Sequence, residues 1–222
     1  MSTPHALSGE RSVTLSIALF GNFNPQIFKP TWFVAEDLIE ANEAKAIEVL
    51  ADSPSLVAFT SERFGLEVSY ERCLFHSSQR HEFDATVKLV QAAFQVLSHT
   101  PVRVMAVALE THIAARSEDD VESVLDFFMP REAWRALGRT GERRLTVEEK
   151  PVPRRDSIVR YELTRSEELQ HAVYFGAIEE FAFVEDPETP IGSSGATMAL
   201  KDHWKAIDKR TAAAVESLFG AT

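Results

Sequence analysis

The chain has 222 residues, of which 45% are hydrophobic and 26% are charged, and its formal net charge is -11. This acidity argues against a general duplex-binding surface, because such a surface displaces counterions with lysine and arginine side chains. The single cysteine, Cys73, excludes an internal disulfide, and no apolar run approaches the length of a membrane span. The first residues lack the apolar core of a signal peptide, so we expect a cytoplasmic protein.

Alternating apolar side chains predict the strands of the first half, and an amphipathic stripe predicts its long helix. The third predicted strand changes phase near Cys73, which is typical of a β-bulge. The residues of the helical stripe, spaced by four and three, are Phe83, Val87, Val90, Phe94 and Leu97. In chain order we expect a loose tail at residues 1–11, a strand at 12–20, a helix at 30–40, strands near 47–49, 57–59 and 64–75, and a helix at 81–98.

The second half, which begins at Pro101, repeats this order of elements. Residues 102–109 are apolar on both faces, which predicts a central strand covered on both sides. Ser117 and the acidic residues after it are typical of the start of a helix. The remaining predicted elements are a short strand at 145–147, strands at 159–163 and 173–183, a loop at 185–195 and a closing helix at 196–219.

These elements predict an α+β fold in which a unit of strand, helix, three strands and long helix occurs twice. We expect one domain, residues 12–222, with two similar halves at 12–100 and 101–220. Short connections make consecutive strands antiparallel neighbours, so the halves should join into one curved antiparallel sheet. The two long helices would lie on its convex face, and no predicted helix covers the other face.

This order of elements resembles the duplicated strand–helix–sheet–helix plan of the TATA-binding-protein-like folds, over about residues 12–219. The resemblance implies a curved sheet. It does not imply DNA binding, because the DNA-reading face of that family is basic and this chain is acidic. Separately, Gly21-Asn22-Phe23-Asn24-Pro25 with Trp32-Phe33 is similar to the start of some uncharacterised bacterial proteins of sporadic distribution. That likeness covers about residues 12–40 and implies a bacterial-type protein without an established activity.

Histidine, cysteine and glutamate side chains supply candidate chemistry, but none completes a metal or catalytic motif. Cys73, His76 and His81 carry zinc-ligand atoms, yet structural zinc sites need a fourth ligand, so we predict no metal and no cofactor. Glu110 and His112 end the central strand and can act as an acid–base pair only if both face one pocket. Because neighbours in a strand point to opposite faces, this pairing is disfavoured and no catalytic residue is assigned.

The most basic part of the chain is residues 139–155. Its candidate anion or nucleic-acid contacts are Arg143, Arg144, Arg154 and Arg155. No aromatic residue is interleaved there for base stacking, so a solvated loop is the alternative. The Gly-Ser-Ser-Gly run at residues 192–195 precedes a helix whose backbone amides could hold an anion, and a flexible helix start is its alternative.

Two interpretations of function follow from these patterns. The first is a non-catalytic protein-binding or assembly module that binds a protein partner or forms a homodimer through the uncovered face. Its candidate contact residues are Tyr161, Phe175, Phe181 and Phe183. The second is an enzyme or small-ligand-binding protein with a pocket between sheet and helices, whose first candidates are Glu110, His112, Cys73 and His76. We favour the first interpretation because no catalytic constellation stands out.

Overall fold

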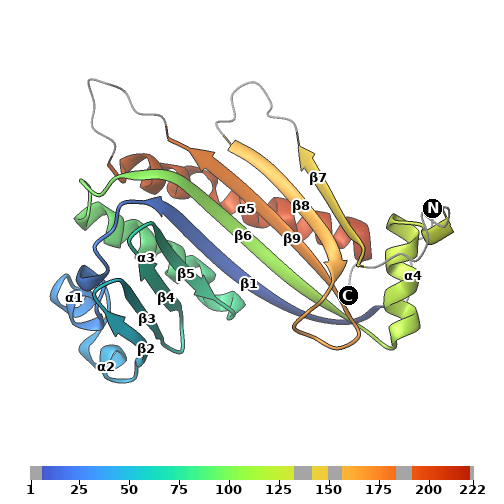
Figure 1. Cartoon of the computed structure of the whole chain (residues 1–222), viewed down its shortest axis with the longest axis horizontal. Helices are drawn as coiled ribbons and strands as arrows, with labels where there is room; N and C mark the ends of the chain where they lie inside the picture. The colour runs from blue at the N-terminus through green and yellow to red at the C-terminus, as the bar shows by residue number, and fades with distance from the viewer. Residues whose placement is uncertain (1–6, 133–141, 150–156, 184–191, 221–222) are drawn as a thin grey trace.

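The computed structural model describes residues 7–132, 142–149, 157–183 and 192–220. Within these residues nine strands form one curved sheet in the order β2-β3-β4-β5-β1-β6-β9-β8-β7 (Figure 1). All neighbouring strands are antiparallel, which confirms the predicted α+β class and the single antiparallel sheet. The strands are β1 (Leu7–Gly21), β2 (Glu48–Ser53), β3 (Leu56–Thr60), β4 (Gly65–Ser69), β5 (Arg72–Ser77), β6 (Val102–Ala115), β7 (Arg144–Glu149), β8 (Ser157–Arg165) and β9 (Ala172–Ala182).

The two halves of the sheet meet along a seam between β1 and β6, which pair over most of their length. From β1 the sheet continues outward through β5, β4 and β3, and from β6 it continues through β9, β8 and β7. In each half, therefore, the first strand lies at the seam, and the later strands follow outward in reverse order along the chain. Strand β2 lies beyond β3, so in the described residues the first half has four strands after β1 rather than the predicted three.

The predicted long third strand is in fact two strands joined by a tight turn. Strand β4 ends at Ser69 and β5 begins at Arg72, and Val68 pairs with Cys73 across the turn. The change of phase near Cys73 is therefore a hairpin, and the prediction of a β-bulge was wrong. Because the chain reverses at the turn, Val68 and Cys73 pair on the same buried face. The buried residues therefore change from even-numbered to odd-numbered positions, which is the same change of phase that a bulge produces.

The two long helices, α3 (Phe83–Val96) and α5 (Ser194–Phe219), lie side by side across one face of the sheet (Figure 1). Shorter helices extend this layer toward both ends of the sheet. Phe33 of α1 (Pro30–Ala35) packs against rings from β3 and β5, and Val124 of α4 (Glu118–Phe128) packs in the core of the second half. Ser117 caps α4 as predicted, since its Oγ accepts from the N–H of Asp120 at 3.3 Å. The remaining helical turns are η1 (Pro25–Ile27), α2 (Ala41–Lys45) and η2 (Arg80–Glu82).

A polar contact fastens the two long helices to each other. Trp204 of α5 is buried, and its indole Nε1 donates to Asp84 Oδ1 of α3 at 2.8 Å. Lys205 donates to the same carboxylate, and this hydrogen bond holds the pKa of Asp84 below its ordinary value. This contact therefore joins α3 and α5 in one layer over the sheet.

Within the described residues, helices cover one face of β6 and leave the other open, so the prediction of a strand covered on both sides was wrong. Met105, Val107 and Leu109 are fully buried beneath the helices. The apolar side chains on its other face are half-buried: Val104, Ala106 and Ala108. Two of these are alanines, and neighbouring strands shield such small side chains without a second layer of helices. The covered face and the opposite face therefore have different surroundings.

Candidate functional site on the open face

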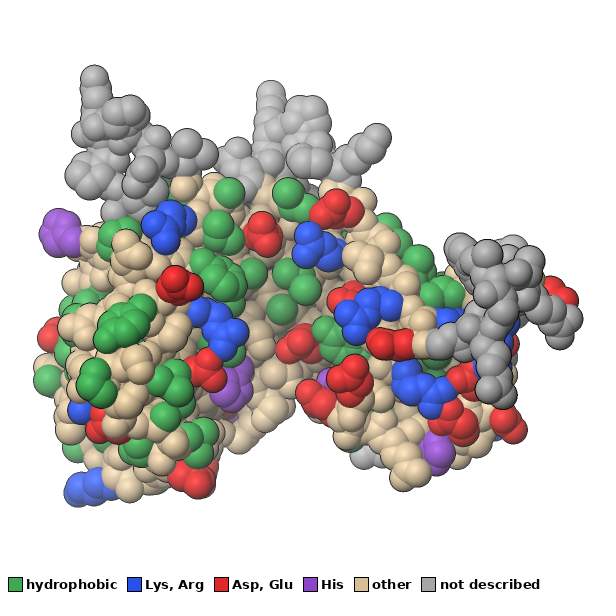
Figure 2. All heavy atoms as spheres, viewed as in Figure 1, with side chains coloured by type: hydrophobic (Ala, Val, Ile, Leu, Met, Phe, Trp, Pro, Cys, Tyr) green, Lys and Arg blue, Asp and Glu red, His purple; other side chains and the backbone are tan. Residues whose placement is uncertain are grey.

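The face of the sheet turned away from the helices, which we call the open face, carries a strip of apolar side chains. Cross-strand pairing places Phe20 beside Val104 and Ala18 beside Ala106 at the seam. Phe20 and Ile158 are each 41% exposed. Figure 2 shows apolar side chains gathered over the central strands of this face. Glu180 lies on this face between Ala106 and Ile158. We call the apolar residues around it the apolar strip: Ala18, Phe20, Leu74, Val104, Ala106, Ala108, Ile158 and Ile178.

Farther along the seam, two hydroxyl groups hold the carboxylate of Glu110. Tyr174 Oη donates to Glu110 Oε1 at 3.2 Å, and Ser16 Oγ donates to Oε2 at 3.3 Å. Gly176 lies opposite Glu110 on β9, where a Cβ would lie 2.5 Å from the Tyr174 hydroxyl oxygen. Glycine at this position therefore leaves the room that Tyr174 uses to reach Glu110. Burial, together with the charge of Glu110, raises the pKa of Tyr174 well above its ordinary value.

Tyr174 is expected to give a late ionisation step in a pH titration followed by tyrosinate absorbance. The Glu110→Gln variant removes a charge that opposes the phenolate, so its late step should move to lower pH. Because the folded pKa is raised, the contribution of Tyr174 to stability is complete below its unfolded pKa and is lost as the pH rises toward the folded value. Tyr174→Phe should abolish the late step, and Glu148→Gln should leave it in place. An unchanged late step in Glu110→Gln would contradict the assignment.

His112 is buried on the same face, with its ring centroid 5.3 Å from that of Tyr174. Its Nδ1 lies 2.9 Å from Ser166 Oγ, and its Nε2 lies 3.3 Å from Glu168 Oε2. Ser166 Oγ already accepts from the backbone N–H groups of Glu168 and Leu169 at 3.2 and 2.9 Å. Two accepted bonds occupy both lone pairs, so the hydroxyl donates its proton to Nδ1. With Nδ1 accepting from Ser166, Nε2 lies where it can donate to Glu168 Oε2.

Glu110 and His112 face one pocket, which corrects the prediction that they point to opposite faces. Thr111 lies between them, and side chains two positions apart in a strand share a face. The pocket has a volume of about 230 Å³ and also includes Tyr174 and Arg144 in its lining. Tyr174 contacts both Glu110 and His112, so the sheet brings these three side chains together in one polar cluster.

The zinc-ligand candidates do not lie together. Cys73 is fully buried beneath the helices, where burial raises the pKa of its thiol. His76 lies on the open face with its ring over Gly65, where a Cβ would lie 2.2 Å from the ring, and burial lowers the pKa of His76. His81 is exposed in η2. Cys73 and His76 are three positions apart in β5, so they point to opposite faces and cannot ligate one ion.

The basic stretch does not present free cations at the two positions that the structure describes. The side chain of Arg143 is only 9% exposed, so it is not available to an external phosphate. Arg144 is exposed but is also ion-paired. The carboxylate partners are Glu122 and Asp126 of α4 for Arg143, and Glu142 and Glu162 for Arg144. The other two candidates, Arg154 and Arg155, lie outside the described residues.

The start of α5 is packed against the end of α3. Ser193 is fully buried, and its Oγ donates to the carbonyl oxygen of Phe94 at 2.5 Å. The backbone N–H of Ser193 donates to the carbonyl oxygen of Ser98 at 3.1 Å. A Cβ on Gly192 would lie 2.3 Å from that same oxygen. The glycine therefore permits a close approach of two chain segments at this helix start.

The aromatic residues predicted to contact a partner lie on the covered side of the sheet. Phe175 and Phe181 are 2% and 3% exposed, and each packs against a ring of α5. Tyr161 stacks on Phe175, and Phe183 packs half-buried against the core. The sequence left open which face these residues share, and the structure places them on the covered face rather than in a patch on the open face. Helix α5 covers the side of β8 and β9 to which they point.

Sequence reasoning missed Phe20, Ile158 and Tyr174 as residues of the open face. The sequence does indicate the position of Phe20. Alternation places Phe20 on the same side of β1 as the polar residues Thr14 and Ser16. An aromatic residue on the polar side of an alternating strand indicates apolar surface on that side. Tyr174 likewise alternates with the buried Phe175, but its link to Glu110 depends on the register between β6 and β9.

No protein-family model matches the chain, and a search of curated proteins returns no match. Among the described residues, no helix has the length and apolar character that crossing a bilayer requires. The functional argument therefore depends on the geometry of the apolar strip and the polar cluster beside it.

Proposed function

We propose that the protein is a non-catalytic binding module that holds a polypeptide partner against its open face. The observation that carries this proposal is the apolar strip, which crosses strands β5, β1, β6, β9 and β8 of the curved sheet. Phe20 near the end of β1 and Ile158 near the start of β8 are its most exposed side chains, at 41% each. Contiguous exposed apolar surface is a mark of interaction sites, because its burial by a partner is favourable. No helix in the described part of the chain covers this strip.

The charges beside the strip favour a basic partner. Glu110 accepts hydrogen bonds from two hydroxyl groups, and no lysine or arginine among the described residues forms an ion pair with it. The chain also has a formal net charge of -11, which attracts a cationic segment and disfavours a second copy of itself. The partner that we propose is a segment that combines apolar side chains with a lysine or arginine placed at Glu110.

Phe20→Glu and Ile158→Glu are each expected to weaken binding at least about tenfold, because each puts a carboxylate in place of an apolar contact. A random peptide library selected on the wild-type protein supplies the probe. Selected peptides should share apolar residues next to a lysine or arginine, and Glu110→Gln should weaken basic peptides more than neutral ones. Fluorescence polarisation of one selected peptide measures each affinity.

Met198→Glu is the matched control, since Met198 is 62% exposed on α5 and far from the open face. It should bind the selected peptide as the wild type does. Peptides that bind Phe20→Glu as tightly as the wild type would refute the proposal, as would a selection without a shared sequence. A dimer seen by sedimentation and lost in Phe20→Glu would identify a second copy of the chain as the occupant instead.

We also propose a cytoplasmic location for the protein. Its single cysteine, Cys73, is buried and reduced, which suits a compartment where thiols persist. Fractionation of cells that express the tagged chain tests this location directly. Recovery with secreted or envelope proteins would contradict it.

A further inference from the structure

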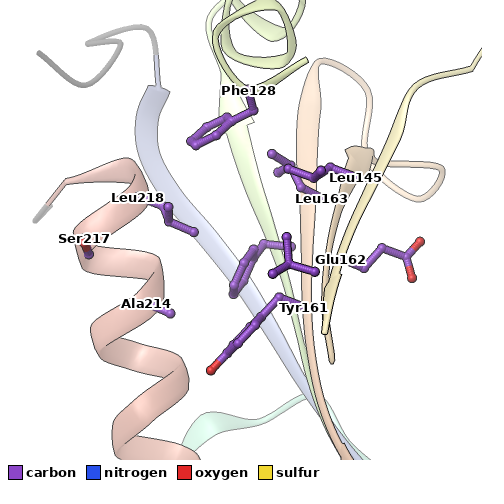
Figure 3. Close-up of a pocket in the computed structure, with 10 residues that line it drawn as sticks. Phe128, Leu145, Tyr161, Glu162, Leu163, Ala214, Ser217 and Leu218 are labelled. Carbon is purple, nitrogen blue, oxygen red and sulfur yellow. The ribbon is translucent and has the colours of Figure 1, made fainter. Parts of the chain in front are cut away.

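A cavity of about 390 Å³ lies on the covered side of the sheet, beneath the strands of the second half (Figure 3). Strands β7, β8 and β9 form one wall, and the ends of α4 and α5 form the other. The sheet separates this cavity from the polar cluster on the open face. Its volume lies within the range of small-molecule sites, which is roughly 300–1,000 Å³.

Aromatic and aliphatic side chains supply most of the cavity wall. The ring of Tyr161 stacks on that of Phe175 with centroids 6.0 Å apart, and Phe175 packs edge-on against Phe219 at 5.8 Å. Figure 3 shows Phe128 of α4 and Leu218 of α5 directed toward the same space. These groups belong to elements that are packed in the core of the second half, so the cavity is formed before any ligand arrives.

Small side chains on the flank of α5 border the cavity. The buried stripe of the helix runs from Leu200 and Trp204 to Val215 and Phe219. Ala214 and Ser217 lie beside this stripe and contribute to the cavity lining. These small side chains leave an apolar hollow between α5 and β8, and a ligand that buries apolar surface there is favoured by the hydrophobic effect.

The polar groups at the cavity are uncharged. Glu162 contributes to the lining, but its carboxylate points away from the cavity in Figure 3. On the open face, Glu162 Oε1 lies 3.1 Å from Arg144 Nε. Among the described lining residues, the hydroxyls of Tyr161 and Ser217 are then the polar side-chain groups that a ligand can meet. We infer that the cavity binds a small uncharged molecule with an apolar, aromatic skeleton and one hydroxyl or carbonyl group near Tyr161.

The neutral dye N-phenyl-1-naphthylamine tests this inference, because its fluorescence rises in apolar sites. The full-length wild-type protein is expected to bind the dye saturably and to melt at a higher temperature in its presence. Ala214→Trp fills the cavity from α5 and should reduce the affinity at least about tenfold. Ala213→Trp is the matched control, because residue 213 is the exposed neighbour on the same helix. It should bind the dye as the wild type does.

Further variants keep the test decisive. Ala214→Leu fills less of the cavity than Ala214→Trp, so it should cause a smaller loss of affinity for the dye. Circular dichroism confirms that each variant is folded.

Tyr161→Phe should weaken the binding of 1-naphthol but not that of naphthalene, since only 1-naphthol carries a hydroxyl. Phe20→Glu should leave dye binding unchanged, which distinguishes this cavity from the open face. A folded Ala214→Trp protein that binds the dye as tightly as the wild type, or dye binding that does not saturate, would overturn the inference.

Discussion

Replacement of Arg210 by alanine is expected to lower the free energy of unfolding by about 3–5 kcal/mol. Arg210 of α5 donates from Nη2 to Glu179 Oε2 of β9, and Ser157 Oγ donates to the other carboxylate oxygen at 2.6 Å. The side chain of Glu179 is 3% exposed, because it faces the helices between Val107 and Val159. Without the guanidinium group, the carboxylate would keep its cost of burial and lose its charge partner.

Urea denaturation followed by circular dichroism measures this loss. The double variant Arg210→Met with Glu179→Leu removes the buried charge together with its partner, so it should regain most of the lost stability. Arg116→Ala is the surface control. It breaks an exposed pair with Asp120 and should cost no more than about 1 kcal/mol. Equal losses for Arg210→Ala and Arg116→Ala would show that the buried pair is not important for stability.

Phe33→Ala should also destabilise the protein by about 3–5 kcal/mol, as expected when a large core side chain leaves a cavity. Phe33 is fully buried at the centre of an aromatic cluster that joins α1 to the sheet. Its ring centroid lies 4.9, 5.9, 6.4 and 6.5 Å from those of Trp32, Phe59, Phe64 and Phe75. Removal of the ring would take contacts from all four neighbours at once, and thermal and chemical denaturation should both report the loss.

Two comparisons make the Phe33 result interpretable. Phe127→Ala truncates a phenylalanine that is 43% exposed on α4 and should cost less than about 1 kcal/mol. Phe33→Leu keeps part of the buried volume and should cost less than Phe33→Ala. If Phe33→Ala costs no more than Phe127→Ala, the cluster must collapse into the vacated space without penalty, and the prediction fails.

Most strands and both long helices could be predicted from the sequence. An element that buries one side repeats its apolar residues at a regular spacing, which differs between a strand and a helix. The hairpin between β4 and β5 could not, since a reversal of the chain and a β-bulge produce the same change of phase near Cys73. Strand β6 continues to Ala115, beyond the predicted end at Leu109. Its later residues include Glu110 and His112, which are tolerated in a strand because they lie on the open face.

The site was harder to predict because it depends on which face the helices cover. Alternation places Phe175 and Phe181 on one side of β9, but only the packing of the distant α5 shows that this side is covered. Arg143 is a similar case. Its partners Glu122 and Asp126 come from α4, so the sequence presents the cation without the carboxylates that neutralise it. The shared face of Glu110 and His112, by contrast, follows from their spacing of two.

The seam between β1 and β6 has a consequence for how the chain folds. Leu15 pairs with Leu109, whereas β2 to β5 pair through short hairpins that can close early. On the ribosome, the first half therefore emerges while the 15-residue β1 still has one edge without a partner. We expect the seam to form late, and the half-synthesised chain to be the form most prone to aggregation. A chain cut between the halves should pair its bare β1 edge with another copy, so neither half is a natural unit for expression.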